Sequence, residues 1–164
     1  MSWEKEIEEL KKREKLAEKM GGKEKLQRQK DNKRLNVRER IDLLLDKDSF
    51  HEQGEIAGGV EVDSDGKLES LTPANFILGF GKINNKQVVV GGEDFTVKGG
   101  SPNAAGLRKS VYTEELALKF KVPLIRLHEG GGGSVAGPGK KSGGYGGDPV
   151  FSKSRFKSVA ETLR

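Results

Sequence analysis

Cysteine is absent from this 164-residue sequence, and histidine occurs only twice. The lack of cysteine excludes thiol nucleophiles, disulfides and cysteine-ligated metals. His51 and His128 are too few and too far apart to suggest a zinc site. No apolar run reaches the roughly 18 residues that a membrane span requires, and the chain is charged from Glu4 onward without an apolar signal region. We therefore predict no metal site, no membrane span, and a cytoplasmic location, or the mitochondrial matrix if a transit peptide has been removed.

Glycine and charge are abundant instead. The sequence holds 23 glycines, most of them between Gly79 and Gly147, and 34% of its residues are charged. The formal net charge is +5 and the isoelectric point is about 9.3. This balance fits an anionic partner, either a phosphate-bearing ligand or a nucleic acid, and it equally fits ordinary solubility. The glycine-rich backbone thus lies in the last two-thirds of the chain. The composition does not decide which kind of partner the chain binds.

Residues 1–48 are predicted to form an N-terminal helical segment. Apolar residues recur at helical spacing among charged ones over residues 3–20, and Gly21-Gly22 supplies a stop because glycine tolerates a left-handed cap. So narrow an apolar stripe indicates a surface helix that lies on a larger body or a partner. Asn36, with Glu39 three residues later, gives a capping-box start to a second, short helix.

Residues 49–164 are predicted to form an α/β domain. Asn84-Asn85-Lys86 is typical of a hairpin turn, and the run Val88-Val89-Val90 indicates a strand that is buried on both faces. The predicted elements, in chain order, are a strand over residues 50–57, a loop over 58–70, strands over 76–83 and 87–90, a glycine-rich turn over 98–102, a helix over 103–120 with Leu107, Val111, Leu116 and Leu118 facing inward, and a strand that begins at 124.

The last predicted strand, residues 124–129, runs directly into the four glycines of 130–133. Bare backbone N–H groups at such a place suit a phosphate or a developing oxyanion. A nucleotide P-loop is excluded because Lys140 is followed by Lys141 rather than Ser or Thr, and a dinucleotide fingerprint is weak because no helix begins cleanly through the following Gly-Pro-Gly. Two interpretations remain, an oxyanion hole formed by the amides of Gly131 and Gly132, and a flexible turn.

Five stretches form an ordered set of motifs. They are Met20-Gly21-Gly22, the run 35–46 with Arg38-Glu39-Arg40, the run 79–90, Glu93-Asp94-Phe95-Thr96-Val97 with Gly99-Gly100-Ser101, and Val122-Pro123-Leu124-Ile125 before Gly131-Gly132. The arginine–glutamate–arginine helix and the Asp-Phe-Thr-Val…Gly-Gly-Ser run are specific when they occur together. In these residues the chain resembles the N-terminal part of the carboxyltransferase (beta) subunits of biotin-dependent acyl-CoA carboxylases, such as propionyl-CoA carboxylase.

The resemblance implies an α/β, crotonase-like spiral of β-β-α units, partial here and preceded by N-terminal helices. It implies transfer of carboxyl from carboxybiotin to the α-carbon of an acyl-CoA, through a thioester enolate that the N–H groups of Gly131 and Gly132 would hold. Gly99-Gly100-Ser101 matches a glycine turn near the groove for coenzyme A. Lys109 aligns with a family lysine and would contact the phosphate or adenine side of the ligand; the alternative for Lys109 is a solvated helix residue.

The resemblance also implies partners. Biotin would be carried on a partner domain, acyl-CoA would be the substrate, and the biotin carboxyl carrier and biotin carboxylase components would complete the complex. A homo-oligomer is expected as well. Since a second domain contributes the biotin side of the site in this family, we expect the chain to correspond to a fragment that does not catalyse the transfer alone.

The sequence departs from the family at the glycine run, and other functions stay open. Gly133-Ser134-Val135 stands where many members have Ala-Arg-Ile, and Glu129-Gly130 stands where Asp-Ser is usual. His128, which is either catalytic or a packed or loop-anchoring residue, stands where Asn is common. These departures predict a subgroup and leave the acyl group open. The alternatives are a biotin-dependent acyl-CoA decarboxylase subunit, an assembly segment, and a basic nucleic-acid-binding module suggested by Lys140-Lys141 and the glycine–tyrosine tract at 143–147.

Overall fold

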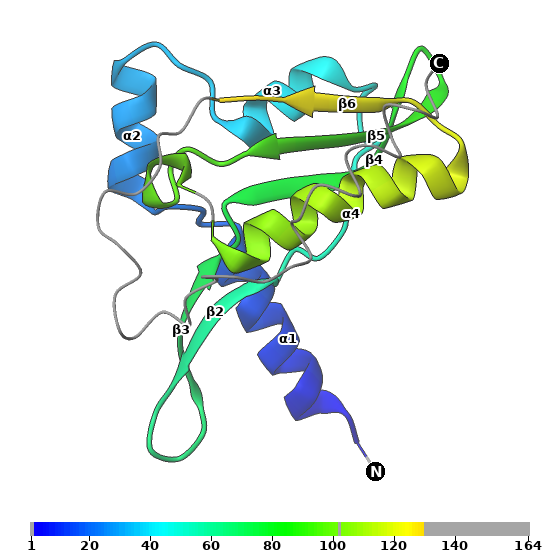
Figure 1. Ribbon diagram of the computed structural model, residues 1–164. Helices are drawn as coiled ribbons and strands as arrows, with labels where there is room; N and C mark the ends of the chain where they lie inside the picture. Colours follow the sequence, from blue (N-terminus) through cyan, green and yellow to red (C-terminus); the bar gives the residue numbers. More distant parts are fainter. Residues whose placement is uncertain (1, 102, 130–164) are drawn as a thin grey trace, which may run out of the picture. The chain divides into compact units, whose positions relative to one another are not determined.

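The computed structural model describes residues 2–101 and 103–129, which belong to the first of two units, 1–133 and 134–164, into which the chain divides. One sheet has the strand order β1-β4-β5-β6, and β2 and β3 form a separate two-stranded sheet (Figure 1). The elements are α1 (Glu4–Ala17), α2 (Lys23–Asp31), α3 (Val37–Leu44), β1 (His51–Glu52), β2 (Gly58–Val62), β3 (Leu68–Pro73), β4 (Phe76–Ile83), β5 (Lys86–Glu93), the 3-10 turn η1 (Lys98–Gly100), α4 (Ala104–Phe120) and β6 (Leu124–Leu127).

The central unit is strand, hairpin turn, strand, helix, strand, as predicted. β4 and β5 pair antiparallel, and the turn between them places Asn84 and Asn85 at φ 49° and 61°, the left-handed values of a type I′ turn. α4 then leads the chain back to the end of the sheet where β5 begins. β6 pairs parallel to β5, with Val90 opposite Ile125. The β-β-α order is therefore confirmed.

The core lies on both faces of β5. Val88 and Val90, which are 4% and 0% exposed, pack with Ile41 of α3 on one face. Val89, which is 0% exposed, packs with Leu116 of α4 on the other. Alternate side chains of a strand point to opposite faces of the sheet, so three consecutive buried valines need a layer on each side. The prediction of a strand buried on both faces is confirmed.

The two helices predicted in the N-terminal segment, α1 and α3, begin close to the expected positions. The Asn36 side chain accepts a hydrogen bond from the Glu39 N–H (3.0 Å), and the Glu39 carboxylate accepts one from the Asn36 N–H (2.8 Å), which completes the predicted capping box. α1 ends at Ala17, three residues before the predicted end, and the left-handed residues that follow are Met20 (φ 52°) and Gly22 (φ 94°). The boundary between residues 48 and 49 stays a prediction.

The prediction of a loop over residues 58–70 is wrong, because β2 and the first half of β3 form a hairpin there. Its turn is organised by Asp63, whose Oδ1 accepts hydrogen bonds from the N–H groups of Asp65 (2.9 Å) and Lys67 (2.8 Å). Gly66 has φ 76° in the same turn. The predicted strand over 50–57 is reduced to the two residues of β1.

The buried face of α4 differs from the face that its apolar pattern indicates. Of the predicted inward residues, Leu116 is buried, Leu107 and Val111 are half-buried, and Leu118 is 49% exposed, so the prediction for Leu118 is wrong. The buried positions are Gly106, Lys109, Thr113, Leu116 and Ala117. Polar side chains can lie on this face because each finds a partner within the fold; the Thr113 hydroxyl donates to the Lys109 carbonyl at 2.8 Å.

Candidate functional site

The carboxyl ends of the parallel strands β5 and β6 meet at one edge of the sheet, and each strand leads into a glycine-rich segment (Figure 1). In α/β sheets this edge is where ligands bind. Arg126 fixes β6 against α4, because its guanidinium donates to the carbonyl of Ser110 (2.9 Å) and its centre lies 4.9 Å from the centroid of the Phe76 ring. The edge is thus built on a rigid strand pair.

Glu93, the last residue of β5, holds the end of β6. One carboxylate oxygen lies 3.1 Å from Nδ1 of His128, and the other accepts a hydrogen bond from the backbone N–H of Glu129 at 3.0 Å. Two contacts from one carboxylate fix the direction in which the chain leaves β6. The chain therefore enters the glycine run at 130–133 from an anchored position, and the alternative of a loop-anchoring His128 agrees with this contact.

Glu129 brings a second carboxyl to the same edge. Burial raises the pKa of Glu129, and the positive charges of Arg40 and Arg34 oppose the shift. Its Oε2 is buried without a hydrogen-bond partner among the described residues. An acid held in such surroundings takes up a proton more readily than a solvated one.

Sequence reasoning missed Glu93 as an anchor; the signal available was its place at the start of the Glu-Asp-Phe-Thr-Val motif.

The predicted turn Gly99-Gly100-Ser101 lies in η1 and directly after it. Gly99 and Gly100 have φ 62° and 72°, and the N–H groups of Gly100 and Ser101 donate within the turn to Val97 (3.1 Å) and Lys98 (3.2 Å). No heavy atom would lie within 4 Å of a Cβ added at Gly99, so the turn is open on that side. A ligand could approach the backbone there, at Gly99 rather than at the amides of Gly100 or Ser101.

Asn75 supports this turn and was missed by sequence reasoning. It is 3% exposed, and its amide nitrogen donates to the Ser101 carbonyl at 2.6 Å. A Cβ at Gly106 would lie 2.0 Å from the Asn75 side-chain oxygen, so the first turn of α4 needs glycine at this contact. The Asn103 side chain caps α4 by accepting from the Gly106 N–H at 2.6 Å. Asn75, which directly precedes β4, therefore holds both the glycine turn and the start of α4.

Two of the motifs quoted above contact each other. The hydroxyl of Thr96 donates to the Asp94 carboxylate (2.6 Å) and accepts from the Gly21 N–H (2.9 Å). A Cβ at Gly21 would lie 1.9 Å from the Thr96 carbonyl oxygen, so only glycine allows this approach. Burial raises the pKa of Asp94, and the hydrogen bonds from Thr96 oppose that shift. The Met-Gly-Gly and Asp-Phe-Thr-Val motifs thus tie the N-terminal helices to the end of β5.

Lys109 lies in a buried charged cluster together with Arg38 and Glu52. Its ammonium is 3.5 Å from one oxygen of Glu52 and donates to the Gly54 carbonyl at 3.1 Å, while the other Glu52 oxygen pairs with Arg38 at 2.7 Å. Lys109 is 7% exposed, so its alternative as a solvated helix residue is wrong. Burial lowers the pKa of Lys109, and the charge of Glu52 opposes the shift.

The space beside Lys109 is small. A cavity of about 10 Å³ lies among Arg38, Glu52, Glu55, Asp94 and Lys109, and this is the room that one water molecule occupies. A phosphate group would not fit, so a contact from Lys109 to coenzyme A would require the ammonium to leave Glu52. The predicted role of Lys109 in ligand binding stays a prediction.

The predicted enolate-binding residues, Gly131 and Gly132, lie outside the described residues, as do the basic and glycine–tyrosine stretches at 140–147. Within residues 2–101 and 103–129, no group of acids and histidines could hold a metal ion. In that same part of the chain, every helix is too short or too polar to cross a bilayer.

Comparisons with known proteins agree on one family. The family model described as the carboxyl transferase domain matches residues 28–160. The propionyl-CoA carboxylase beta chain of Roseobacter denitrificans is 31% identical over 154 residues, which are 93% of this chain and 29% of that protein. The transcarboxylase 12S crystal structure, a hexamer with methylmalonyl-coenzyme A and methylmalonic acid bound, matches with a TM-score of 0.69 at 27% identity and covers 82% of this chain and 26% of its own.

A second solved structure, the beta subunit of P. aeruginosa geranyl-CoA carboxylase, matches with a TM-score of 0.56 at 27% identity over 68% of this chain and 20% of its own. The fold is thus the crotonase-like α/β class, present as a partial spiral after N-terminal helices. The chain belongs to the carboxyl transferase domain family. It spans 29% of the length of the Roseobacter relative and 26% of the transcarboxylase chain.

Proposed function

We propose that this chain supplies the acyl-CoA side of a biotin-dependent acyl-CoA carboxylase carboxyltransferase. The reaction moves a carboxyl group from carboxybiotin to the α-carbon of an acyl-CoA, whose thioester passes through an enolate. The amides of Gly131 and Gly132 hold the enolate oxygen, and Gly99, Gly100 and Ser101 border the groove for coenzyme A. Adjacent N–H groups in a rigid setting stabilise such an oxyanion more than they stabilise the ground-state carbonyl.

One observation carries the proposal, the anchoring of the chain by Glu93 where β6 ends. One oxygen of this carboxylate contacts His128 and the other accepts from the Glu129 N–H. These contacts hold Glu129, the residue directly before the glycine run. An oxyanion hole depends on such positioning because small displacements of its donors cost rate steeply. A flexible turn would need no anchor of this kind.

The partners follow from the same proposal. Biotin reaches the site on a carrier component and is charged by a biotin carboxylase component; none of the described residues is assigned to biotin. The subunit works as a homo-oligomer, in the cytoplasm or, after removal of a transit peptide, in the mitochondrial matrix. A decarboxylase subunit and a nucleic-acid-binding module are less favoured, since the relatives and structures reported above are carboxylases or a transcarboxylase. One decarboxylase does match, because the methylmalonyl-CoA decarboxylase subunit alpha of Veillonella parvula is 28% identical over 77% of this chain.

Calorimetry on the 164-residue chain tests the proposal. We expect propionyl-CoA to bind, and Glu93→Ala to weaken that binding about tenfold, because one lost anchoring carboxylate is worth about 1.4 kcal/mol here. Glu61→Ala, which removes an exposed acid of β2, is the matched control and should bind as the parent does. Single-stranded RNA is the second titrant.

Two results would contradict the proposal. One is RNA binding with a steep salt dependence and no binding of propionyl-CoA, which is the behaviour of a basic nucleic-acid module. The other is equal loss of propionyl-CoA affinity in Glu93→Ala and Glu61→Ala, which would show that the anchor at the end of β6 has no particular role.

A further inference from the structure

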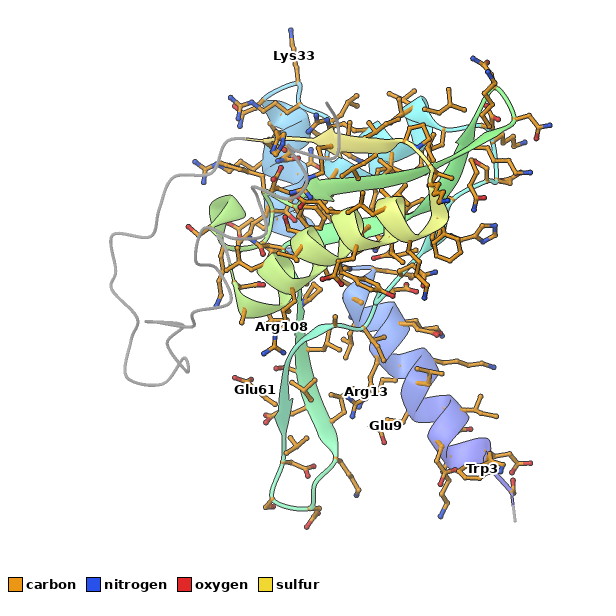
Figure 2. The ribbon with its side chains drawn as sticks, turned by 45° about the vertical axis from the view of Figure 1, so that its right-hand side comes forward. Trp3, Glu9, Arg13, Lys33, Glu61 and Arg108 are labelled. Atoms are coloured by element: carbon orange, nitrogen blue, oxygen red, sulfur yellow. The ribbon has the colours of Figure 1, made fainter. Side chains whose placement is uncertain are left out.

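The first half of α1 carries an uncovered apolar stripe. Trp3, Ile7 and Leu10 are 68%, 48% and 44% exposed. Figure 2 shows the helix running out beside the β2–β3 hairpin with Trp3 near its free end. Exposed apolar side chains in a continuous row on one helix face indicate a contact surface rather than chance exposure.

The spacing of the stripe is that of a coiled coil. Positions 3, 7 and 10 are separated by four and three residues, which is the d–a–d pattern of a heptad repeat. The next two positions of the pattern are Glu14 and Ala17, and Ala17 is buried against the chain's own body at 2% exposure. The free part of the seam therefore runs from Trp3 to Leu10 and stops at Glu14.

The charges that flank the seam are segregated by sign. The e and g positions hold Glu4 and Glu6 in the first turn, then Lys11 and Arg13 one heptad later. In coiled coils these positions choose the partner and its orientation. Arg13 pairs with Glu9 of its own helix, and both residues are labelled in Figure 2.

We propose that α1 pairs antiparallel with α1 of a second copy of this chain. Ile7 of one helix then faces Leu10 of the other, and Trp3 lies over the Glu14 stem. At the flanks, the acids at positions 4 and 6 meet the bases at positions 11 and 13 of the partner helix. The same patch serves both copies, as a two-fold interface requires.

The antiparallel orientation follows from what a parallel pair would bring together. A parallel seam sets Glu14 against Glu14, and like charges at a core position repel. It also brings the two bodies, which begin where Ala17 is buried, to the same end of the pair. An antiparallel pair places the bodies at opposite ends and opposes the two helix dipoles.

A second copy fits this surface better than an anionic partner does. Between Glu4 and Lys15 five acids and five bases cancel, so α1 presents no net positive face to a nucleic acid or an acidic membrane. Along the seam the acids come first and the bases follow, so an antiparallel copy of α1 places bases opposite acids. Surface charge pairs weaken in salt, so the association should be strongest at low ionic strength.

Charge reversal on the full chain tests the pairing. Sedimentation velocity should show a reversible dimer. The double variants Glu4→Lys/Glu6→Lys and Lys11→Glu/Arg13→Glu should each weaken it by at least about tenfold, because every flanking pair becomes repulsive. An equimolar mixture of the two variants should restore the dimer. Lys5→Glu/Lys15→Glu, which changes charge away from the seam, is the control and should associate as the parent does.

Orientation and burial have separate measurements. Trp3 is the single tryptophan, so its emission should shift to the blue on dimerisation and report on the seam itself. The chain has no cysteine, so a mixture of Trp3→Cys and Glu14→Cys should form a disulfide-linked heterodimer, whereas Leu10→Cys alone should not link to itself. A monomer at all concentrations, an unrestored mixture, or ready self-linking of Leu10→Cys would each overturn the proposal. Circular dichroism confirms that each variant remains folded.

Discussion

β5 and β2 are both strands, yet they are held by different forces. All three consecutive valines of β5 are at most 4% exposed, whereas every residue of β2 is exposed, including Val60 at 40% and Val62 at 54%. β5 lies between two strands and two helix layers, while β2 pairs with β3 alone. Apolar burial therefore stabilises the central sheet, and backbone pairing with a specific turn stabilises the hairpin.

Among the described residues, the hairpin contacts its neighbours mainly along β3. Leu68 and Leu71 are buried, at 6% and 8% exposure. Lys12 of α1 donates to the Leu68 carbonyl at 2.8 Å, and the Ala74 N–H donates to the Ala57 carbonyl at the base of the hairpin, also at 2.8 Å. The comparison predicts that truncating an apolar side chain to alanine has very different effects in the two regions. A substitution at the junction between them should have an intermediate effect.

The largest effect is expected in the central sheet. Leu78→Ala removes a side chain of β4 that is 1% exposed, and should lower the free energy of unfolding by about 3 kcal/mol through lost burial and the cavity left behind. Val62→Ala in the hairpin should change it by less than about 0.5 kcal/mol. Urea unfolding followed by circular dichroism measures both. Comparable losses in the two variants would remove the distinction between the regions.

The next effect lies at the junction, where Lys109 joins α4 to Glu52 and to the Gly54 carbonyl just before the hairpin. Lys109→Met should lower the free energy of unfolding by about 2 kcal/mol. This is less than the usual cost of breaking a buried pair, because Glu52 keeps Arg38 as a partner. Lys119→Met, at an exposed position of the same helix, is the control and should be near neutral.

The pH dependence of this variant has a definite sign. Burial lowers the pKa of Lys109 from 10.5 in spite of the opposing charge of Glu52. The folded chain thus releases this proton at a lower pH than the unfolded chain, so folding gains stability as the pH rises through the lowered pKa toward 10.5. Lys109→Met lacks that gain, and its deficit relative to the parent should widen toward alkaline pH. A deficit that narrows would contradict the buried position of Lys109.

Local signals in the sequence explain which elements could be predicted. Asn84-Asn85 specifies the tight turn before β5, and Asn36 with Glu39 specifies the start of α3, so each element was visible within a few residues. β2 gave a weaker signal, because its two glycines are typical of a loop and the alternation Val60-Glu61-Val62 is only three residues long. The Asp-Gly step at 65–66 was the available clue to the hairpin.

The site depended on contacts that local patterns do not contain. Glu93 and His128 are 35 residues apart in sequence, and Lys109 and Glu52 are 57 residues apart, yet folding brings each pair together. The order of the motifs pointed to the correct family, although it does not show which of the motif residues contact each other. The contact of Thr96 with Gly21 shows why two distant motifs occur together.

A smaller effect than that of Lys109→Met is expected in the hairpin turn. Gly66 has φ 76°, and no heavy atom lies within 4 Å of a Cβ added there, so Gly66→Ala introduces backbone strain without a clash, worth about 1 kcal/mol. Amides of β2 and β3 should then exchange with solvent about fivefold faster by hydrogen–deuterium exchange, while those of β5 keep their rates. Gly59→Ala, also in open space but without a positive φ, is the matched control and should not speed exchange. If the exchange rates of the β5 amides rise together with those of the hairpin, the two regions unfold as one cooperative unit. The hairpin and the central sheet would then not differ in local stability, even though different interactions hold them.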